Sequence, residues 1–354
     1  MKILKREPQL WRLRIETEDD LWALARIARK GMQIGMLGER RDQTTGGDEG
    51  GRAKAAERKK MWIRLHIETT EYQTFSENLR IHGTIEEAQF DIGMHHTHVV
   101  EIRDEVELTS SQLFSSSDKD LLKQAERASG QTNVVIAVAE TDEVVIFHVT
   151  ARGLREGATW TMRGGGKRGE LRQSAGIATT FRSKVISALV DTLGPETPLV
   201  LCGPGHARDA LHSDLKAAGE TRMMKSVATS MAGRAGANEV LRDGLAGSLL
   251  SEHAISREIE LIETAWERLS TNGAVAYGTE ALNKAMNEGA IETLLISADL
   301  LRDETEFIGT QTWMQWVNGL SDIGAELVQC STDHDAGQQL VGLGGAIAML
   351  RYAM

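Results

Sequence analysis

Three histidines lie within a four-residue stretch, at His95, His96 and His98. In a β-strand, residues two apart share a face, so His96 and His98 would point one way and His95 the other. Such a pair could share a zinc ion, but zinc normally needs three or four protein ligands. No H-x-x-E-H, H-E-x-x-H or C-x-x-C motif accompanies the pair. We therefore predict a structural role, in which the imidazoles of a strand form hydrogen bonds with the backbone.

An acidic cluster, Glu18, Asp19 and Asp20, offers a second kind of chemistry. Two or three carboxylates can hold a divalent metal cation and activate water for cleavage of a phosphodiester bond. The same acids also follow Thr17, a good helix cap, and acids in a first helical turn stabilise the helix by about 0.3–1 kcal/mol each. Consecutive helical residues point in diverging directions, which suits chelation badly. The sequence thus favours the helix-stabilising role over a catalytic one.

A glycine-rich segment from Gly164 to Gly169 satisfies the pattern G-x-G-x-x-G. A dinucleotide site needs this turn between a strand and a helix, and the preceding residues 153–161 are a poor strand candidate by sequence. Lys167 is followed by Arg168 and has no glycine five residues before it, so there is no Walker loop either. We therefore expect no bound nucleotide cofactor.

Charge is distributed unevenly along the chain. The net charge is −11, whereas a general nucleic-acid binder is usually basic. Residues 40–64 nevertheless carry eight basic and four acidic side chains, and residues 151–172 carry six and two. Two local excesses of +4 on an acidic chain predict phosphate contacts at defined places. The candidate RNA-binding residues are Arg40, Arg41, Arg52, Lys54, Arg58, Lys59, Lys60, Arg163, Lys167 and Arg168.

A length of 354 residues indicates two or three domains, and 41% apolar with 26% charged residues is typical of a soluble protein. Cys202 and Cys330 each end an apolar run, so we expect buried, reduced thiols. The first residues lack the apolar segment of a signal peptide, and no run approaches the ~20 apolar residues that span a bilayer. We expect a cytoplasmic protein without membrane contact.

The order of elements changes along the chain. The first third alternates apolar and polar residues as half-buried strands do, notably at 10–15, 61–67 and 99–108. The rest alternates strands with helices, which is typical of layered α/β domains. In this part we expect helices at 173–193, 238–251 and 310–323, among others.

Five blocks of residues stand out together by their order and spacing. They are Glu18 to Trp22, Leu79-Arg80-Ile81-x-Gly83-x-Ile85, Ile92-Gly93-x-His95-His96-Thr97, Gly203-Pro204-Gly205, and Leu343-Gly344-Gly345-Ala346 to Tyr352. In this order and spacing they resemble the Pelota family of ribosome-rescue factors. The resemblance spans essentially the whole chain. It implies three domains: an Sm-like β-barrel over 1–128, a ribonuclease-H-like α/β domain over 129–253 and a ribosomal-protein-like α/β/α domain over 254–354. His206 stands where the family usually has phenylalanine, which puts the local packing in question.

The resemblance also implies a function. A Pelota-type protein enters the A site of a stalled ribosome on its mRNA, is delivered by an elongation-factor-like GTPase, and is followed by an ABC-type ATPase that splits the subunits. We expect a monomer of archaeal type, because the chain lacks the acidic extension of eukaryotic relatives. The related class I release factors use a Gly-Gly-Gln loop, which this sequence does not contain. The alternative is a divalent-metal-dependent endoribonuclease that cuts the stalled mRNA, an activity attributed to the family's N-terminal domain.

Overall fold

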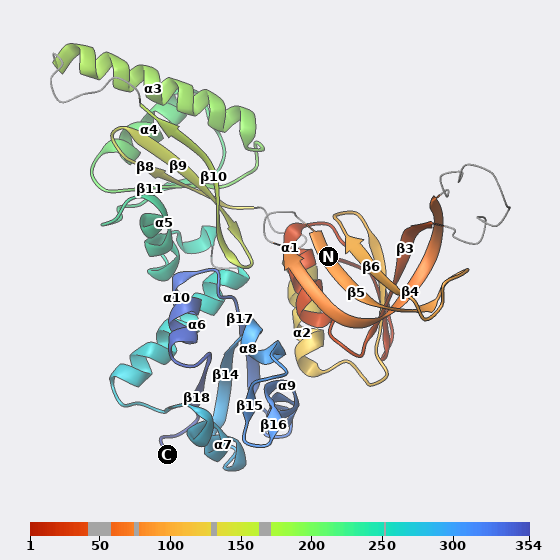
Figure 1. Ribbon diagram of the computed structural model, residues 1–354. Helices are drawn as coiled ribbons and strands as arrows, with labels where there is room; N and C mark the ends of the chain where they lie inside the picture. The colour runs from red at the N-terminus through yellow and green to blue at the C-terminus, as the bar shows by residue number, and fades with distance from the viewer. Residues whose placement is uncertain (42–57, 74–77, 129–132, 163–170, 251–252) are drawn as a thin grey trace, which may run out of the picture. The chain divides into compact units, whose positions relative to one another are not determined.

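The computed structural model describes residues 1–41, 58–73, 78–128, 133–162, 171–250 and 253–354 (Figure 1). The chain divides into two compact units, Met1–Gln131 and Thr132–Met354. The boundary falls close to residue 128, where the first of the three expected domains ends. No helix among the described residues has the length and apolar character needed to cross a membrane.

The first unit consists mainly of strands, as its sequence pattern predicts. Its elements are β1 (Lys2–Arg6), β2 (Leu10–Arg14), α1 (Glu18–Ile27), β3 (Gln33–Arg41), β4 (Arg58–Gln73), β5 (Asn78–Glu87), β6 (His95–Val100), β7 (Glu105–Thr109) and α2 (Ser116–Ala128). The strands form one antiparallel sheet in the order β1-β2-β7-β3-β4-β5-β6. Strand β6, which carries the three histidines, follows β5 at the end of this order.

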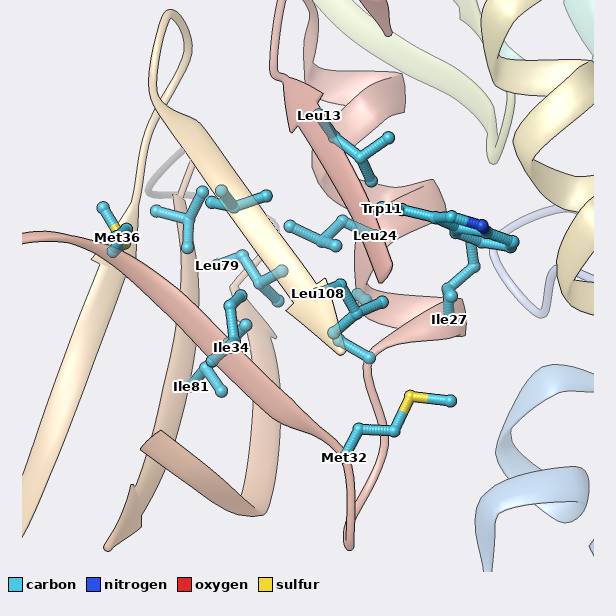
Figure 2. Packing of buried hydrophobic residues seen from close by; sticks show 14 of the residues in the cluster. Trp11, Leu13, Leu24, Ile27, Met32, Ile34, Met36, Leu79, Ile81 and Leu108 are labelled. Carbon is cyan, nitrogen blue, oxygen red and sulfur yellow. The ribbon is translucent and has the colours of Figure 1, made fainter. Parts of the chain in front are cut away.

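One apolar cluster fills the first unit. Alternate residues of a strand share a face, and Figure 2 shows such pairs from three strands within the cluster: Trp11 and Leu13, Ile34 and Met36, and Leu79 and Ile81. Helix α1 adds Leu24 and Ile27. The Trp11 ring stacks on Phe114 with centroids 3.6 Å apart. Each fully buried side chain of this size contributes roughly 1.5–3 kcal/mol to folding.

Strand β4 changes its buried face at Glu68. Before this residue the odd-numbered side chains are buried, namely Met61, Ile63, Leu65 and Ile67. After it, the even-numbered ones turn inward. The Thr70 hydroxyl donates to the Ala28 carbonyl at 3.0 Å, and the Tyr72 ring lies 5.9 Å from that of Trp22.

The pairing of β4 with β5 explains the change of face. Ile67 pairs with Gly83, and Thr69 pairs with His82, so Glu68 has no residue opposite it. A strand with one such extra residue contains a β-bulge, which re-aims the side chains that follow. Glu68 keeps the outer face that alternation from Ile67 gives it, which is also the face of His82, and the residues from Thr69 onward change face.

The second unit begins with a mixed sheet covered by helices. Its elements are β8 (Val135–Ala139), β9 (Glu143–Thr150), β10 (Gly153–Thr161), α3 (Leu171–Thr192), β11 (Leu199–Cys202), α4 (Ala207–Ala217), β12 (Met224–Ser226), α5 (Gly233–Arg242) and the 3-10 helix η1 (Gly247–Leu249). The strand order is β10-β9-β8-β11-β12, antiparallel up to β8 and parallel beyond it.

A second sheet follows in the same unit. Its elements are α6 (Ala254–Ser270), β13 (Val275–Tyr277), α7 (Thr279–Asn287), β14 (Ile291–Ser297), α8 (Ala298–Arg302), β15 (Phe307–Ile308), β16 (Gln311–Thr312), α9 (Trp313–Trp316), the 3-10 helix η2 (Val317–Leu320), β17 (Glu326–Cys330), α10 (Asp335–Gly342) and β18 (Ala346–Leu350). The order is β13-β18-β14-β17, and β15 pairs separately with β16. Trp313 and Trp316 are buried.

The apolar residues of the second unit are divided between the two faces of its sheets. Odd-numbered residues of β8 pack with α3 and α4, whereas even-numbered residues belong to a cluster with α5 and α6. This last cluster also takes residues from the second sheet, including Leu295, Ile347 and Cys330. Both cysteines are buried free thiols, as expected, and burial raises the pKa of Cys202 to about 12.

Four expectations about local structure were wrong. The alternating stretch 99–108 is not one strand, since β6 ends at Val100 and β7 begins at Glu105. Residues 153–161 do form a strand, β10, because pairing with β9 at the sheet edge stabilises a stretch with few buried side chains. The helix expected over 238–251 is α5, which ends at Arg242, since Gly244 and Gly247 adopt positive φ angles of 60° and 57°. The helix expected over 310–323 is a short α9 followed by a 3-10 turn.

Gly83→Ala should destabilise the first unit through the bulge. A Cβ at Gly83 would lie 1.9 Å from the carbonyl oxygen of His66, so the two strands would have to separate. We expect a loss of about 2–3 kcal/mol in the free energy of unfolding, measured with urea.

Gly93→Ala is the matched control, because Gly93 has a positive φ of 84° but no atom lies within 4 Å of the point that a Cβ would occupy there. It should cost only about 1 kcal/mol of backbone strain. Equal losses in both variants would contradict the role assigned to the close strand approach.

Candidate nucleic-acid interface and histidine clusters

Strands β3 and β4 form an antiparallel hairpin (Figure 1). The basic residues Arg40, Arg41, Arg58, Lys59 and Lys60 lie at one end of it. The antiparallel register pairs Arg40 with Lys59 and Glu39 with Lys60. Lys59 and Lys60 are exposed. Arg40 is different, since its side chain is only 16% exposed and its Nε donates to the Asp91 carboxylate at 2.6 Å. Arg40 therefore holds the turn before β6 in place.

The remaining predicted contact residues cannot be placed in the same detail. Arg41 and Arg58 are paired in the backbone ladder of the same hairpin. Their position agrees with a basic hairpin end, and contact with RNA stays a prediction. The others lie outside the described residues: Arg52, Lys54, Arg163, Lys167 and Arg168.

The acidic cluster begins helix α1, and Asp20 is part of its cap. The Thr17 hydroxyl accepts from the Asp20 backbone N–H at 3.3 Å. In return, one oxygen of the Asp20 carboxylate accepts from the backbone N–H groups of Thr17 and Glu16 at 3.0 and 2.8 Å. This reciprocal pair is a capping box, which satisfies N–H groups that a helix start leaves unbonded.

The second oxygen of the Asp20 carboxylate is 2.5 Å from the Met1 ammonium, and both groups are buried. Glu18 and Asp19 lie in the same helical turn and are half-buried. Within the part of the chain that the structure describes, the three acids do not form a group whose ligand atoms lie within 4.8 Å of one another. The contacts of Asp20 support the helix-stabilising role.

His96 and His98 share the inner face of β6, as predicted. Their rings meet edge to face with centroids 5.1 Å apart. His98 is buried and its Nε2 bonds to the backbone carbonyl of Ile63 at 3.0 Å, the kind of structural contact expected. Burial lowers the pKa of His98 to about 4, and the neighbouring His96 contributes to the lowering. Burial also lowers the pKa of His96, and the positive charge of the nearby Arg40 lowers it further.

His95 belongs to a different cluster on the outer face, which the sequence pattern did not reveal. The Nε2 atoms of His95 and His82 lie 3.3 and 3.8 Å from oxygens of the Glu68 carboxylate. The two rings are stacked, with centroids 5.4 Å apart. Alternation from the buried Ile67 already places Glu68 on the outer face, but only the pairing of β4, β5 and β6 brings His82 and His95 beside it.

The segment Gly203-Pro204-Gly205 forms the turn between β11 and α4. Gly203 has a φ of 138°, and a Cβ there would lie 2.3 Å from the Ala139 carbonyl oxygen, so only glycine fits. The Arg208 guanidinium donates to the carbonyl of Gly203 at 2.9 Å and to that of Gly205. His206 is exposed, so its replacement of phenylalanine leaves no hole in the core.

Comparison with known proteins identifies the group to which this chain belongs. Residues 1–126 match the family model of the Pelota N-terminal domain, and residues 255–354 match that of eRF1 domain 3. The protein pelota homolog of Natronomonas pharaonis is 34% identical over 347 residues, which cover 96% of this chain and 94% of the relative. The chain belongs to the Pelota family.

Solved structures agree with the Pelota fold. The crystal structure of the Thermoplasma acidophilum Pelota protein matches with a TM-score of 0.78 and 21% identity over all of both chains. The Saccharomyces cerevisiae protein Dom34 matches with a TM-score of 0.52 and 17% identity over 100% of this chain and 99% of that one. The expected fold class of a multi-domain Pelota protein is thereby confirmed. The division of the second unit at residue 253 stays a prediction.

Replacing Asp20 separates the structural role of the acidic cluster from a catalytic one. Asp20→Asn removes the charge that faces a buried ammonium and weakens the capping box, so we expect a loss of roughly 2–4 kcal/mol in the free energy of unfolding. Glu18→Gln and Asp19→Asn, as controls in the same turn, should each cost less than about 1 kcal/mol. Urea unfolding of the three variants tests this, and equal losses would contradict it.

The buried His98 predicts a dependence of stability on pH. Its pKa in the folded chain is about 4, below the ordinary 6.5, so the unfolded chain binds more protons between these values. Stability should therefore be complete above pH 6.5 and fall as the pH drops toward 4, by roughly 2–3 kcal/mol from this group. His98→Gln should lose that part of the dependence. Urea unfolding at about pH 7 and about pH 4.5 measures it; identical differences in both proteins would refute the assignment.

Proposed function

We propose that this chain rescues stalled ribosomes by binding in the empty A site of a ribosome on its mRNA and promoting dissociation of the subunits. The match to a curated pelota homologue along nearly the whole chain carries this proposal. The two terminal family models in their expected order support it further. Dom34, whose fold this chain shares, is described as a translation termination-like factor involved in RNA quality control pathways.

The basic end of the β3–β4 hairpin supplies the physical basis for RNA contact. Phosphate contacts position a protein on RNA without sequence recognition. On a chain that is acidic overall, such contacts are limited to the regions that carry exposed basic side chains. We assign the mRNA side to this hairpin and the acceptor-stem side to the basic residues between β10 and α3. Since ribosomes are the target, the protein would act in the cytoplasm.

Partners follow from the same proposal. Dom34 is described as interacting with Hbs1, and we propose an elongation-factor-like GTPase in the corresponding role here. An ABC-type ATPase would then split the ribosome, and the chain would act as a monomer. Peptide release is not part of the proposal, because none of the glycine pairs in the sequence is followed by glutamine.

Cleavage of the mRNA is the competing function, and Asp20 argues against it. A catalytic carboxylate must be able to approach a metal and a water molecule, whereas both oxygens of the Asp20 carboxylate bind groups of its own chain. The direct test adds purified protein, GTPase and ATPase to ribosomes stalled on a labelled mRNA, with Mg²⁺ present. We expect separated subunits and intact mRNA; scission without splitting would contradict the proposal.

Neutralising the hairpin end tests the RNA contact itself. Arg58→Ala, Lys59→Ala and Lys60→Ala together should weaken ribosome binding and lower the slope of log K against log salt by about 2, since each lost phosphate contact removes a little under one counterion. Binding is measured by co-sedimentation between 50 and 200 mM salt, roughly the range used for counterion analysis.

A control variant separates location from net charge. Lys119 and Lys123 are exposed residues of α2 in the same unit, and replacing both with alanine should leave the slope unchanged. The same slope for the wild type and the hairpin variant would rule out the assignment of RNA contact to this hairpin.

A further inference from the structure

Glu68, His82 and His95 come from three neighbouring strands, β4, β5 and β6, and meet on the outer face of the sheet. One ligand atom from each lies within 4.8 Å of the other two. The side chains are 37%, 41% and 60% exposed, so solvent and small ions reach all three. Two imidazoles and one carboxylate are a common set of protein ligands for a divalent transition-metal ion.

Hydrogen bonds with two threonines orient Glu68 and His82. The Thr84 hydroxyl donates to one oxygen of the Glu68 carboxylate at 2.6 Å. The Thr97 hydroxyl lies 2.9 Å from Nδ1 of His82. When Nδ1–H donates to this hydroxyl, the lone pair on Nε2 points toward Glu68. Hydrogen bonds of this kind fix the ring and tautomer of metal-binding histidines, and an isolated ion pair would not require them.

The bulge in β4 adds to this arrangement. Alternation from the buried Ile67 already places Glu68 on the outer face. Because Thr69 pairs with His82 and Glu68 has no residue opposite it, both residues of β4 lie beside His82. Bulges are common next to functional sites.

We propose that Glu68, His82 and His95 bind one zinc-like transition-metal ion on the surface of the first unit. Tetrahedral zinc with bonds of about 2.0–2.1 Å needs ligand atoms ~3.4 Å apart. The His95 and His82 nitrogens lie 3.3 and 3.8 Å from the two oxygens of the Glu68 carboxylate, close to this edge length. One ligand nitrogen of each histidine lies within 4.8 Å of the other, and rotation of the exposed His95 ring would shorten that distance. Magnesium and calcium are poor fits, because both prefer oxygen ligands.

Such an ion would join three strands and leave one coordination position to water. It would tie β6 to β4 across β5, so binding should raise the thermal stability of the first unit. The site does not depend on the proposed action on ribosomes, and its test requires no ribosome.

Zinc titration of the metal-stripped full chain tests the proposal. Calorimetry should give one ion per chain, and saturating zinc should raise the unfolding temperature by about 5 °C. His82→Gln and His95→Gln should each weaken binding at least tenfold. Thr97→Val should weaken it by roughly ten- to a hundredfold through loss of the orienting contact.

His66→Gln is the matched control, since His66 is a partly exposed histidine of β4 that contacts Glu86 instead. It should bind zinc like the wild type. Cobalt offers a readout that needs no variant: paramagnetic shifts should appear in the ring signals of His82 and His95 in the wild-type chain. Unshifted signals, equal zinc binding by the His82 and His95 variants, or no binding at zinc concentrations on the order of 10 μM would each overturn the proposal.

Discussion

The contact between Gly83 and the carbonyl of His66 determines how the outer half of the first sheet is built. At this point two backbones come closer than any side chain would allow, and β4 accommodates one extra residue. The side chains of β4 that follow Glu68 change face as a result, so Thr70 and Tyr72 reach the core. The absence of a Cβ at Gly83 thereby determines which side chains of β4 pack beside α1 and which lie on the outer surface.

The histidines of β6 show how one strand can serve two environments. His98 lies in the interior and stays neutral near pH 7, because burial makes its protonated form costly and lowers its pKa to about 4. His95, three residues earlier, lies on the solvent-exposed face beside the Glu68 carboxylate. The pKa of Glu68 is lowered, first by the hydrogen bond from Thr84 and then by the two nearby histidines. The alternation of a β-strand separates these roles without any change in residue type.

The sequence predicted much of this fold because its signals were local or repeated. Alternation identified β2 and the first half of β4, and Thr17 predicted the start of α1. The side of His96 relative to His95 also followed from strand periodicity alone. The pattern did not reveal the bulge, since two-residue periodicity cannot specify which strand pairs with which. Glu68 was missed for that reason, and β10 was missed because its stability comes from a neighbouring strand.

The limits of α5 and α9 were missed for a different reason. The apolar spacing of both segments continues beyond the helix, while backbone angles at glycines such as Gly244 end the regular structure. Asp20 illustrates the converse. Its acidic neighbours suggested a shared role, yet Asp20 is buried, and its carboxylate binds the backbone N–H groups of Glu16 and Thr17 and the Met1 ammonium.

The apolar cluster shared by the two sheets of the second unit has a consequence for dissecting this protein. Ile255 and Ile259 of α6 belong to the same cluster as Val134 and Val240, which come from the other side of residue 253. A fragment cut at that point would expose to solvent the apolar residues that pack together in the intact unit. Exposed apolar patches of this kind promote association with other chains. Self-association of such a fragment would therefore report the exposed cut surface and not an oligomeric state of the intact protein.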